Sequence, residues 1–219
     1  MSTKPQITSW SFSRWAEYEK CPLRAKLKFI DKLKEPSGPA LEKGVRVHQL
    51  AQDYVEGTLK RLPLELKLFA QPFRDLKKIG AKCEQDWAFT TRWEPTGWFA
   101  PDAWLRVKTD VVYVDDADMT VIDHKTGKQY PDHATQLELY ALAGFLVVPE
   151  AGWVHAHDWY LDTGLTREGT FSRCDTDTLK KEWLQRTKPM LKDTKFCPRP
   201  GSHCRWCIFK KEEGGQCPY

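Results

Sequence analysis

An aspartate and a lysine that stand two positions apart, Asp123 and Lys125, are well suited to hydrolytic chemistry. Side chains two apart on a β-strand point to the same face of the sheet. The carboxylate can hold a divalent cation, and the amine can orient or deprotonate a water molecule. Asp110 precedes this pair and offers a second carboxylate. Two converging carboxylates repel unless a cation lies between them, so Asp110 and Asp123 predict a Mg²⁺ or Mn²⁺ site.

A β-hairpin is the element that must bring these aspartates together. Residues 104–114 and 119–125 are rich in β-branched and aromatic residues, and a polar turn at residues 115–118 separates them. In such a hairpin Asp110 and Asp123 approach each other across the ladder. An Asp-x-Lys pair alone is more typical of a surface salt bridge, so its interpretation depends on the neighbouring motifs.

The remaining pattern predicts helices around the hairpin and two further strands. Helices are expected over residues 11–30, with a break at Pro22, and over residues 41–59, 73–90, 133–147 and 175–192; strands are expected over 153–161 and 165–171. This order predicts an α/β fold with a mixed β-sheet flanked by helices. We expect a single domain with a helical part (residues 1–95), a sheet core (96–175) and a C-terminal helix with a cysteine cluster (176–219).

Composition is that of an ordinary globular protein, with 219 residues, of which 41% are apolar. The formal net charge of +4 permits a polyanionic partner without demonstrating one. No apolar run approaches the roughly 20 residues that span a bilayer. The first ten residues lack the apolar region of a signal peptide, so we expect a cytoplasmic location.

The cysteines gather near the C-terminus. Four of the seven are Cys197, Cys204, Cys207 and Cys217. In a chain without an export signal, such clustering favours metal or iron–sulfur ligation over disulfides. Cys204 and Cys207 form a Cys-x-x-Cys pair, which can bind one metal or cluster from a tight turn. A local zinc site made by these four cysteines is one alternative.

Together, the motifs resemble the PD-(D/E)XK nucleases. The run Val-Ile-Asp-His-Lys-Thr-Gly (residues 121–127), preceded by Val-Lys-Thr-Asp (residues 107–110) on the first strand, resembles their catalytic core. Residues 19–24, the Gly-x-x-x-His stretch at 44–48 and the Gln-x-x-x-Tyr stretch at 136–140 match further family motifs in the expected order. The branch that is most similar is the RecB-like group, which includes CRISPR-associated nucleases and phage exonucleases.

The resemblance implies a role for each matching residue. The implied Mg²⁺ or Mn²⁺ ligands are His48, Asp110, Asp123 and the carbonyl of His124, and the implied catalytic residues are Asp110, Asp123, Lys125, Gln136 and Tyr140. Glu84, on the helix expected over residues 73–90, is a weaker candidate for a further carboxylate. Thr109 stands where the family name has proline, and Asp102, which does follow a proline, is a competing acid that lies nearer to a strand start.

The same resemblance implies a 4Fe-4S cluster. Its ligands would be Cys21, far away in the sequence, with Cys204, Cys207 and Cys217. The gap between Cys207 and Cys217 is longer than is usual in the family, and Cys197 competes as a ligand. A loop-rich tail with little apolar content would gain stability from a cluster that links it to the N-terminal part of the chain.

These features predict a metal-dependent DNA exonuclease. Its expected substrate is single-stranded DNA or DNA ends, and its expected setting is recombination, repair or end processing, with a protein partner in a recombination or replication complex. One alternative is a structure-selective endonuclease on the same fold. Another is a non-catalytic DNA-binding module that retains the fold and cluster. A zinc-binding interaction protein would explain the cysteines but not the hairpin.

Overall fold

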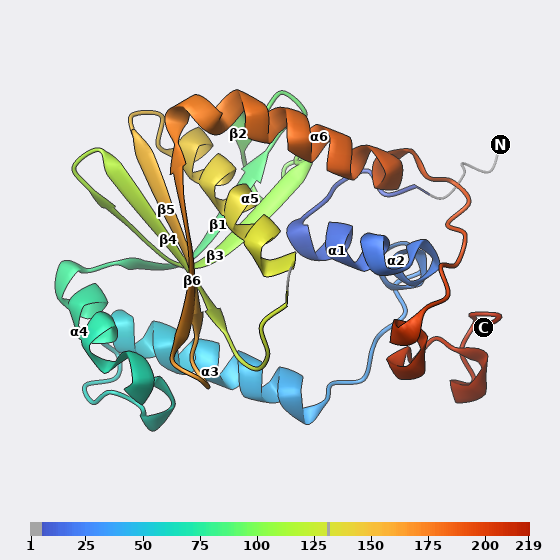
Figure 1. Ribbon diagram of the computed structural model, residues 1–219, viewed down its shortest axis with the longest axis horizontal. Helices are drawn as coiled ribbons and strands as arrows, with labels where there is room; N and C mark the ends of the chain where they lie inside the picture. Colours follow the sequence, from blue (N-terminus) through green and yellow to red (C-terminus); the bar gives the residue numbers. More distant parts are fainter. Residues whose placement is uncertain (1–5, 131) are drawn as a thin grey trace. The chain divides into compact units, whose positions relative to one another are not determined.

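Residues 37–180 form one compact unit, the sheet unit, which is built on a mixed β-sheet (Figure 1). The computed structural model describes residues 6–130 and 132–219. The strand order is β2-β1-β3-β4-β5-β6. The strands are β1 (Lys82–Phe89), β2 (Pro95–Thr96), β3 (Leu105–Asp115), β4 (Asp118–Lys125), β5 (Trp153–Tyr160) and β6 (Leu165–Ser172).

Helices cover both faces of this sheet. Strands β4 and β5 are parallel and the other neighbours are antiparallel. A parallel pair needs a long crossover, and α5 (Asp132–Val147) supplies it on one face. On the other face lie α3 (Pro39–Val55) and α4 (Ala70–Ile79), with the 3₁₀ helix η1 (Leu64–Phe69) before α4 (Figure 1). The expected α/β fold with a mixed, helix-flanked sheet is confirmed.

Strand β4 lies at the centre of the sheet and is buried on both faces. Ile122 packs into the apolar core beneath α3 and α4. On the opposite face, a Cβ added to Gly144 of α5 would lie 3.1 Å from Met119 Sδ and 3.2 Å from a methyl group of Val154. The absence of a side chain at Gly144 therefore lets α5 pack closely against β4 and β5, which fixes the height of α5 above the sheet.

One predicted element is wrong in its second half. The helix expected over residues 73–90 ends at Ile79, because Gly80 adopts the left-handed conformation (φ 67°) that commonly terminates helices. Strand β1 follows and pairs with β3. The predicted hairpin is confirmed as β3 and β4, and the other predicted helices and strands agree with the structure to within a few residues at their ends.

Both ends of the chain form a second compact unit, the terminal unit, from residues up to Pro36 and from Lys181 onward. It contains α1 (Phe12–Lys20), α2 (Pro22–Phe29), most of α6 (Thr176–Lys192), and the 3₁₀ helices η3 (Ser202–Trp206) and η4 (Lys211–Glu213); η2 (Arg173–Asp175) precedes α6 in the sheet unit. The expected break at Pro22 is confirmed, with Cys21 extended between the two helices. Among the described helices, none is long and apolar enough to cross a membrane.

Candidate active site

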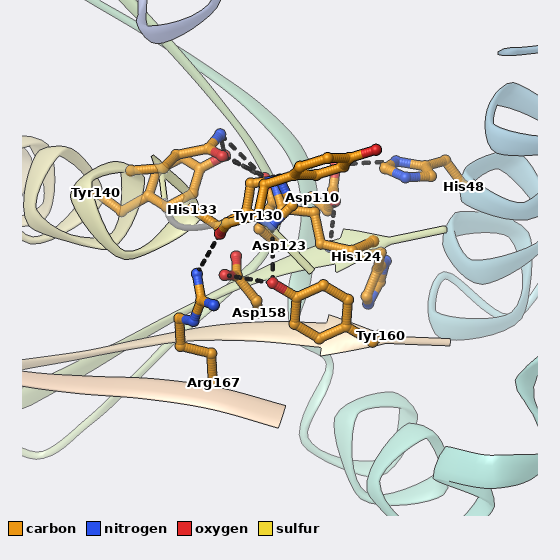
Figure 2. A network of polar contacts seen from close by, with 12 residues as sticks. His48, Asp110, Asp123, His124, Tyr130, His133, Tyr140, Asp158, Tyr160 and Arg167 are labelled. Atoms are coloured by element: carbon orange, nitrogen blue, oxygen red, sulfur yellow. Dashed lines mark hydrogen bonds and ion pairs between the residues drawn. The ribbon is translucent and has the colours of Figure 1, made fainter. Parts of the chain in front are cut away.

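The β3–β4 hairpin sets the two predicted aspartates opposite each other. Val111 pairs with Ile122 in the antiparallel ladder, and extending that register by one residue places Asp110 opposite Asp123. Val111 and Ile122 face the core under α3 and α4, so the aspartates, one residue away, point to the face that α5 covers. Figure 2 shows both carboxylates in one polar network with residues from α3, α5 and β5.

Asp110 is held from two sides. His48 of α3 places its Nδ1 3.2 Å from Asp110 Oδ1, and the backbone N–H of His124 donates to Asp110 Oδ2 at 2.6 Å. Burial lowers the pKa of His48, but the hydrogen bond to Asp110 and the surrounding carboxylates outweigh it, and the net pKa is raised. His48 must therefore release a proton before it can bind a metal, so metal affinity should rise with pH.

Glu84 joins this pair and is the site residue that the sequence places least well. It lies on β1, not on a helix, between the ladder pairs Cys83–Val111 and Gln85–Thr109. Its φ of 51° is a left-handed conformation that is costly for a residue with a side chain. His48, Glu84 and Asp110 each offer a ligand atom within 4.8 Å of the others. These donors suit a divalent cation of the Mn²⁺ type, which accepts both imidazole and carboxylate ligands.

Asp123 and Lys125 belong to a second group, which α5 holds in place. Lys125 Nζ lies 2.6 Å from Asp123 Oδ2 and donates to Gln136 Oε1 at 2.7 Å. Gln136 Nε2 donates to the Tyr140 hydroxyl at 2.8 Å, and that hydroxyl donates to Asp123 Oδ1. The four side chains close a ring of hydrogen bonds. Asp123 thus contacts Lys125 and Tyr140, and is not part of the group formed by His48, Glu84 and Asp110.

Electrostatics fixes the protonation of this ring. Burial lowers the pKa of Lys125, but the attraction of Asp123 outweighs it and the net pKa is raised, so the amine carries its proton. Burial raises the pKa of Tyr140 well above its ordinary value, and the charge of Asp123 raises it further. Tyr140 therefore acts as a hydrogen-bond donor at every physiological pH. In this arrangement Lys125 is an orienting cation and not a free base.

The His124 ring and Asp102 lie outside the two groups of side chains described above. The ring of His124 is buried on the opposite face from Asp123, against Phe73 and Trp159, and its Nε2 has no hydrogen-bond partner among the described residues. Its backbone N–H contacts Asp110, and the expected role of its carbonyl as a metal ligand stays a prediction. Asp102 is exposed, and its carboxylate accepts a hydrogen bond from Thr96 Oγ1 at 3.0 Å. It lies outside the polar network that contains Asp110.

An open groove runs along α3 to the metal-ligating group. Its lining includes Gly44, His48, Gln52, Glu84, Lys108, Asp110 and Thr126. A Cβ added to Gly44 would lie 3.3 Å from Thr126 Oγ1, so glycine lets α3 approach the loop that follows Lys125. Lys108 Nζ lies 2.8 Å from a carboxylate oxygen of Glu84. The groove gives an extended ligand access to His48 and Asp110.

The family match extends beyond the residues of this site to nearly the whole chain. The PD-(D/E)XK nuclease superfamily model matches residues 9–211. This chain belongs to the PD-(D/E)XK nuclease superfamily. No curated protein matches its sequence.

Two of the solved structures that are similar to this chain share little sequence with it. The crystal structure of SSO0001 matches with a TM-score of 0.52 and 17% identity, over 99% of this chain and 89% of SSO0001. A Eubacterium rectale crystal structure named "Putative exonuclease" matches with a TM-score of 0.49 and 14% identity, over 91% of this chain and 88% of the other. At such identity, the SSO0001 match shows a shared fold.

Membership in the PD-(D/E)XK superfamily makes the chain a phosphodiester hydrolase that acts on nucleic acid and uses divalent metal ions. The residues present fit this chemistry. Two carboxylates and one imidazole converge at His48, Glu84 and Asp110, and a protonated lysine lies beside the next carboxylate, Asp123. A superfamily member needs ligands for a cation that stabilises charge and a group that orients water, and these residues offer both.

The terminal unit of this PD-(D/E)XK protein contains a second group of possible ligands. Cys21, Cys204, Cys207 and Cys217 line one small cavity together with Leu27 and Phe209. Cys197 is exposed and does not line it. The backbone N–H groups of Arg199 and Gly201 donate to the sulfurs of Cys21 (3.5 Å) and Cys204 (3.4 Å).

Four cysteine thiolates are the ligand set of two kinds of metal centre, a zinc ion and a 4Fe-4S cluster. Among the described residues, the four cysteines do not form a group with ligand atoms within 4.8 Å of one another. The four thiols that line this cavity are a donor set that either centre uses.

Proposed function

We propose that this protein is a metal-dependent DNA exonuclease of the RecB-like branch, acting in DNA recombination, repair or end processing. The observation that carries the proposal is the convergence of two groups of side chains at the central strands β3 and β4. His48, Glu84 and Asp110 offer ligands for a cation, and Asp123 and Lys125 lie on the neighbouring strand. The Gln136 and Tyr140 pair, which matches the family's Gln-x-x-x-Tyr motif, holds that second group.

In this proposal, one set of residues holds the cation and another orients the attacking water. A divalent cation bound at this group would supply Lewis-acid stabilisation of the charge that develops on the scissile phosphate. His48 and Asp110 would hold it, with Glu84 and Asp123 as further ligands. Lys125, kept protonated by Asp123, would orient the attacking water and attract the phosphate. Water then forms the new P–O bond while the P–O bond to the departing sugar oxygen breaks; solvent takes up the proton that the water loses and supplies the one that the sugar oxygen gains.

Gln136 and Tyr140 act as positioning residues in this scheme. Gln136 accepts from Lys125 and donates to Tyr140, so it fixes where the ammonium group points. Tyr140 donates to Asp123 and so selects the carboxylate orientation. The 4Fe-4S cluster that we propose for Cys21, Cys204, Cys207 and Cys217 would be structural, because all four cysteines belong to the terminal unit and the hydrolytic residues to the sheet unit.

The decisive experiment is digestion of end-labelled DNA. Wild type, Asp110→Asn and Lys125→Ala would be compared on single- and double-stranded DNA of one sequence, with Mg²⁺, Mn²⁺ or EDTA. We expect release of labelled nucleotides by wild type with either metal, and a loss of roughly 10²- to 10⁴-fold in both variants. Asp102→Asn is the matched control, because it removes an exposed carboxylate that the network does not use.

Two outcomes would contradict the proposal in different ways. Cleavage of covalently closed single-stranded circles at a rate similar to that of linear strands would show an endonuclease. DNA binding without hydrolysis under every metal condition would show a non-catalytic binding module. Full activity in Lys125→Ala would refute the assignment of the site while leaving the nuclease activity intact.

A further inference from the structure

A row of three aromatic rings leads from the core to the surface beside the active site. The ring of Tyr160, which is fully buried, stacks on that of His133 with centroids 5.9 Å apart and planes at 21°. Tyr130 meets His133 edge-on, with centroids 5.5 Å apart. The Tyr130 side chain ends the row and is 54% exposed. Figure 2 shows these rings in the close-up that contains Asp110 and Asp123.

The inner rings of this row are fixed by polar contacts. The Tyr160 hydroxyl lies 2.8 Å from His133 Nδ1 and donates to Asp158 at 3.4 Å. Burial lowers the pKa of His133 to about 4, and the positive charge of Lys125 lowers it further. The imidazole is therefore neutral at neutral pH; it stacks on Tyr160 and meets Tyr130 edge-on. The outermost ring thus lies against an imidazole that is itself hydrogen-bonded to Tyr160.

A guanidinium group lies next to the exposed end of the row. Arg167 of β6 donates from Nη1 to the backbone carbonyl of Tyr130 at 2.8 Å, which ties the loop after β4 to the sheet. This contact joins Arg167 to the Tyr130 backbone in Figure 2. Guanidinium groups bind phosphate through several N–H donors held in one plane. The exposed Tyr130 and a guanidinium group of a kind that suits phosphate are thus joined through the Tyr130 backbone.

The row is close to the hydrolytic residues. His133 precedes Gln136 by three residues on α5, and residues so spaced are neighbours on a helix, with Cβ atoms about 5–6 Å apart. Gln136 in turn contacts Lys125. On the sheet, Tyr160 is the direct ladder partner of Lys125. Gln136 and the ladder between β4 and β5 thus connect the row to Lys125.

We propose that Tyr130 is the stacking platform for an unpaired base next to the scissile phosphate, and that Arg167 contacts a phosphate of the same strand. Every base offers an aromatic face, so such a platform binds single strands with little regard to sequence. A paired base has both faces covered by its neighbours and cannot use the platform without unstacking. The inference rests on the proposed DNA-hydrolysing function and adds a preference for single-stranded DNA or frayed ends.

The test compares Tyr130 variants on single-stranded and duplex oligonucleotides of one sequence, with kcat and KM measured separately. Tyr130→Ala should raise KM for the single strand by roughly 5- to 150-fold, the equivalent of about 1–3 kcal/mol per stacked base, and leave kcat largely unchanged. Tyr130→Phe and Tyr130→Trp retain a stacking face and should keep the wild-type KM. Phe99→Ala removes another exposed aromatic ring, 92% exposed in the sheet unit, and is the matched control.

An abasic site in the substrate separates stacking from a structural effect. Moving the abasic site along the strand should reveal one position at which wild type loses about as much affinity as Tyr130→Ala loses on the intact strand. At that position Tyr130→Ala should lose nothing further. Equal losses in both proteins at every position, or a Phe variant as weak as the Ala variant, would overturn the inference.

Failure of the proposed function would be recognised separately. Fluorescence anisotropy with a labelled oligothymidine in EDTA measures binding without any hydrolysis. If wild type cleaves no DNA, the exonuclease proposal fails, while weaker binding by Tyr130→Ala than by Tyr130→Phe would still support the platform. If wild type cleaves DNA and all Tyr130 variants bind equally, the platform alone is refuted.

Discussion

Asp158 is a fully buried carboxyl group beside Asp123 in the parallel ladder of β4 and β5. One of its oxygens accepts a hydrogen bond from Tyr160, and the other has no hydrogen-bond partner among the residues that the structure describes. Burial raises the pKa of Asp158 to about 7; Lys125 lowers it and Asp123 raises it. The folded protein therefore favours the protonated form of this group.

Removing this carboxyl group should change how stability depends on pH. Between the ordinary pKa of 3.8 and the folded value of about 7, the folded protein keeps a proton that the unfolded chain has released. The free energy of unfolding contributed by Asp158 is thus fully present below this window and is lost as pH rises through it. Asp158→Asn should lack that slope. Above the window it should exceed wild type in stability by on the order of 1–3 kcal/mol, because the amide, unlike the carboxylate, places no charge in the buried position.

Urea unfolding of cation-free protein at several pH values across this window measures the difference between the two curves. Subtracting the variant from wild type cancels the contributions of the other titrating groups. Asp86→Asn, which changes an exposed carboxylate on β1, should follow wild type. Parallel curves for wild type and Asp158→Asn would show that Asp158 is charged in the folded protein.

At the residue scale, the sequence predicts what depends on local geometry. Asp110, Asp123 and Lys125 follow from a hairpin with a short turn, and that register holds in the structure. The position of Glu84 cannot be predicted in this way, because its left-handed backbone conformation interrupts the helix or strand periodicity on which such a prediction depends. Asp158 looks like an ordinary polar residue of an alternating strand. Its burial depends on the layer of side chains above β5, which no local pattern describes.

The position of α5 matters at the scale of elements, because this helix carries His133, Gln136 and Tyr140. Arg173, just after β6, caps its C-terminal end. The guanidinium donates to the carbonyls of Phe145, Val148 and Ala151, at 2.6–3.4 Å. These carbonyls lie at or just beyond the end of the helix, where intrahelical partners run out. The Arg173 side chain therefore supplies hydrogen-bond donors to the carbonyls of the turn that joins α5 to β5.

Replacing this cap should destabilise the sheet unit. Arg173→Met keeps the apolar stem but leaves the three carbonyls without the guanidinium, which should lower the free energy of unfolding by about 2–3 kcal/mol. Urea denaturation followed by circular dichroism measures the change. Arg92→Met is the control, because Arg92 is 80% exposed in its ion pair with Glu94 and such pairs contribute little. Equal midpoints for Arg173→Met and wild type would show that solvent replaces the cap without cost.

The error at residues 82–89 shows why some elements escape prediction. The segment Lys-Cys-Glu-Gln-Asp-Trp-Ala-Phe contains several good helix formers, so its propensity favours continuation of α4. Pairing with β3 overrides that preference, and such pairing is a tertiary interaction between segments far apart in sequence. Alternation is also blurred, because Glu84 interrupts the ladder. By contrast, α5 and the hairpin are predicted well because their patterns are long and uninterrupted.

At the scale of the whole molecule, the terminal unit is assembled from both ends of the chain, and the whole sheet unit separates these ends in the sequence. Its cysteine region has little apolar core, with Leu27, Cys207 and Phe209 as the buried residues of one small cluster. The entropy of closing a long loop grows only slowly with its length, so the separation itself is tolerable. A bound metal centre that ligates Cys21 and the C-terminal cysteines would supply the missing stabilisation.

The cluster proposal therefore predicts different effects for two cysteines. Anaerobically purified wild type should be brown, with about four iron and four sulfide per chain. Cys21→Ser should lose iron and the visible absorbance and should melt at a lower temperature, because it removes the only proposed ligand on the N-terminal side. Cys197→Ser should retain both, since Cys197 is exposed and lies outside the cavity. Stoichiometric zinc that depends on Cys197 and not on Cys21 would instead establish a local site within the C-terminal segment, and the link between the two chain ends would then rest on helix packing such as the stacked rings of Trp10 and Trp183.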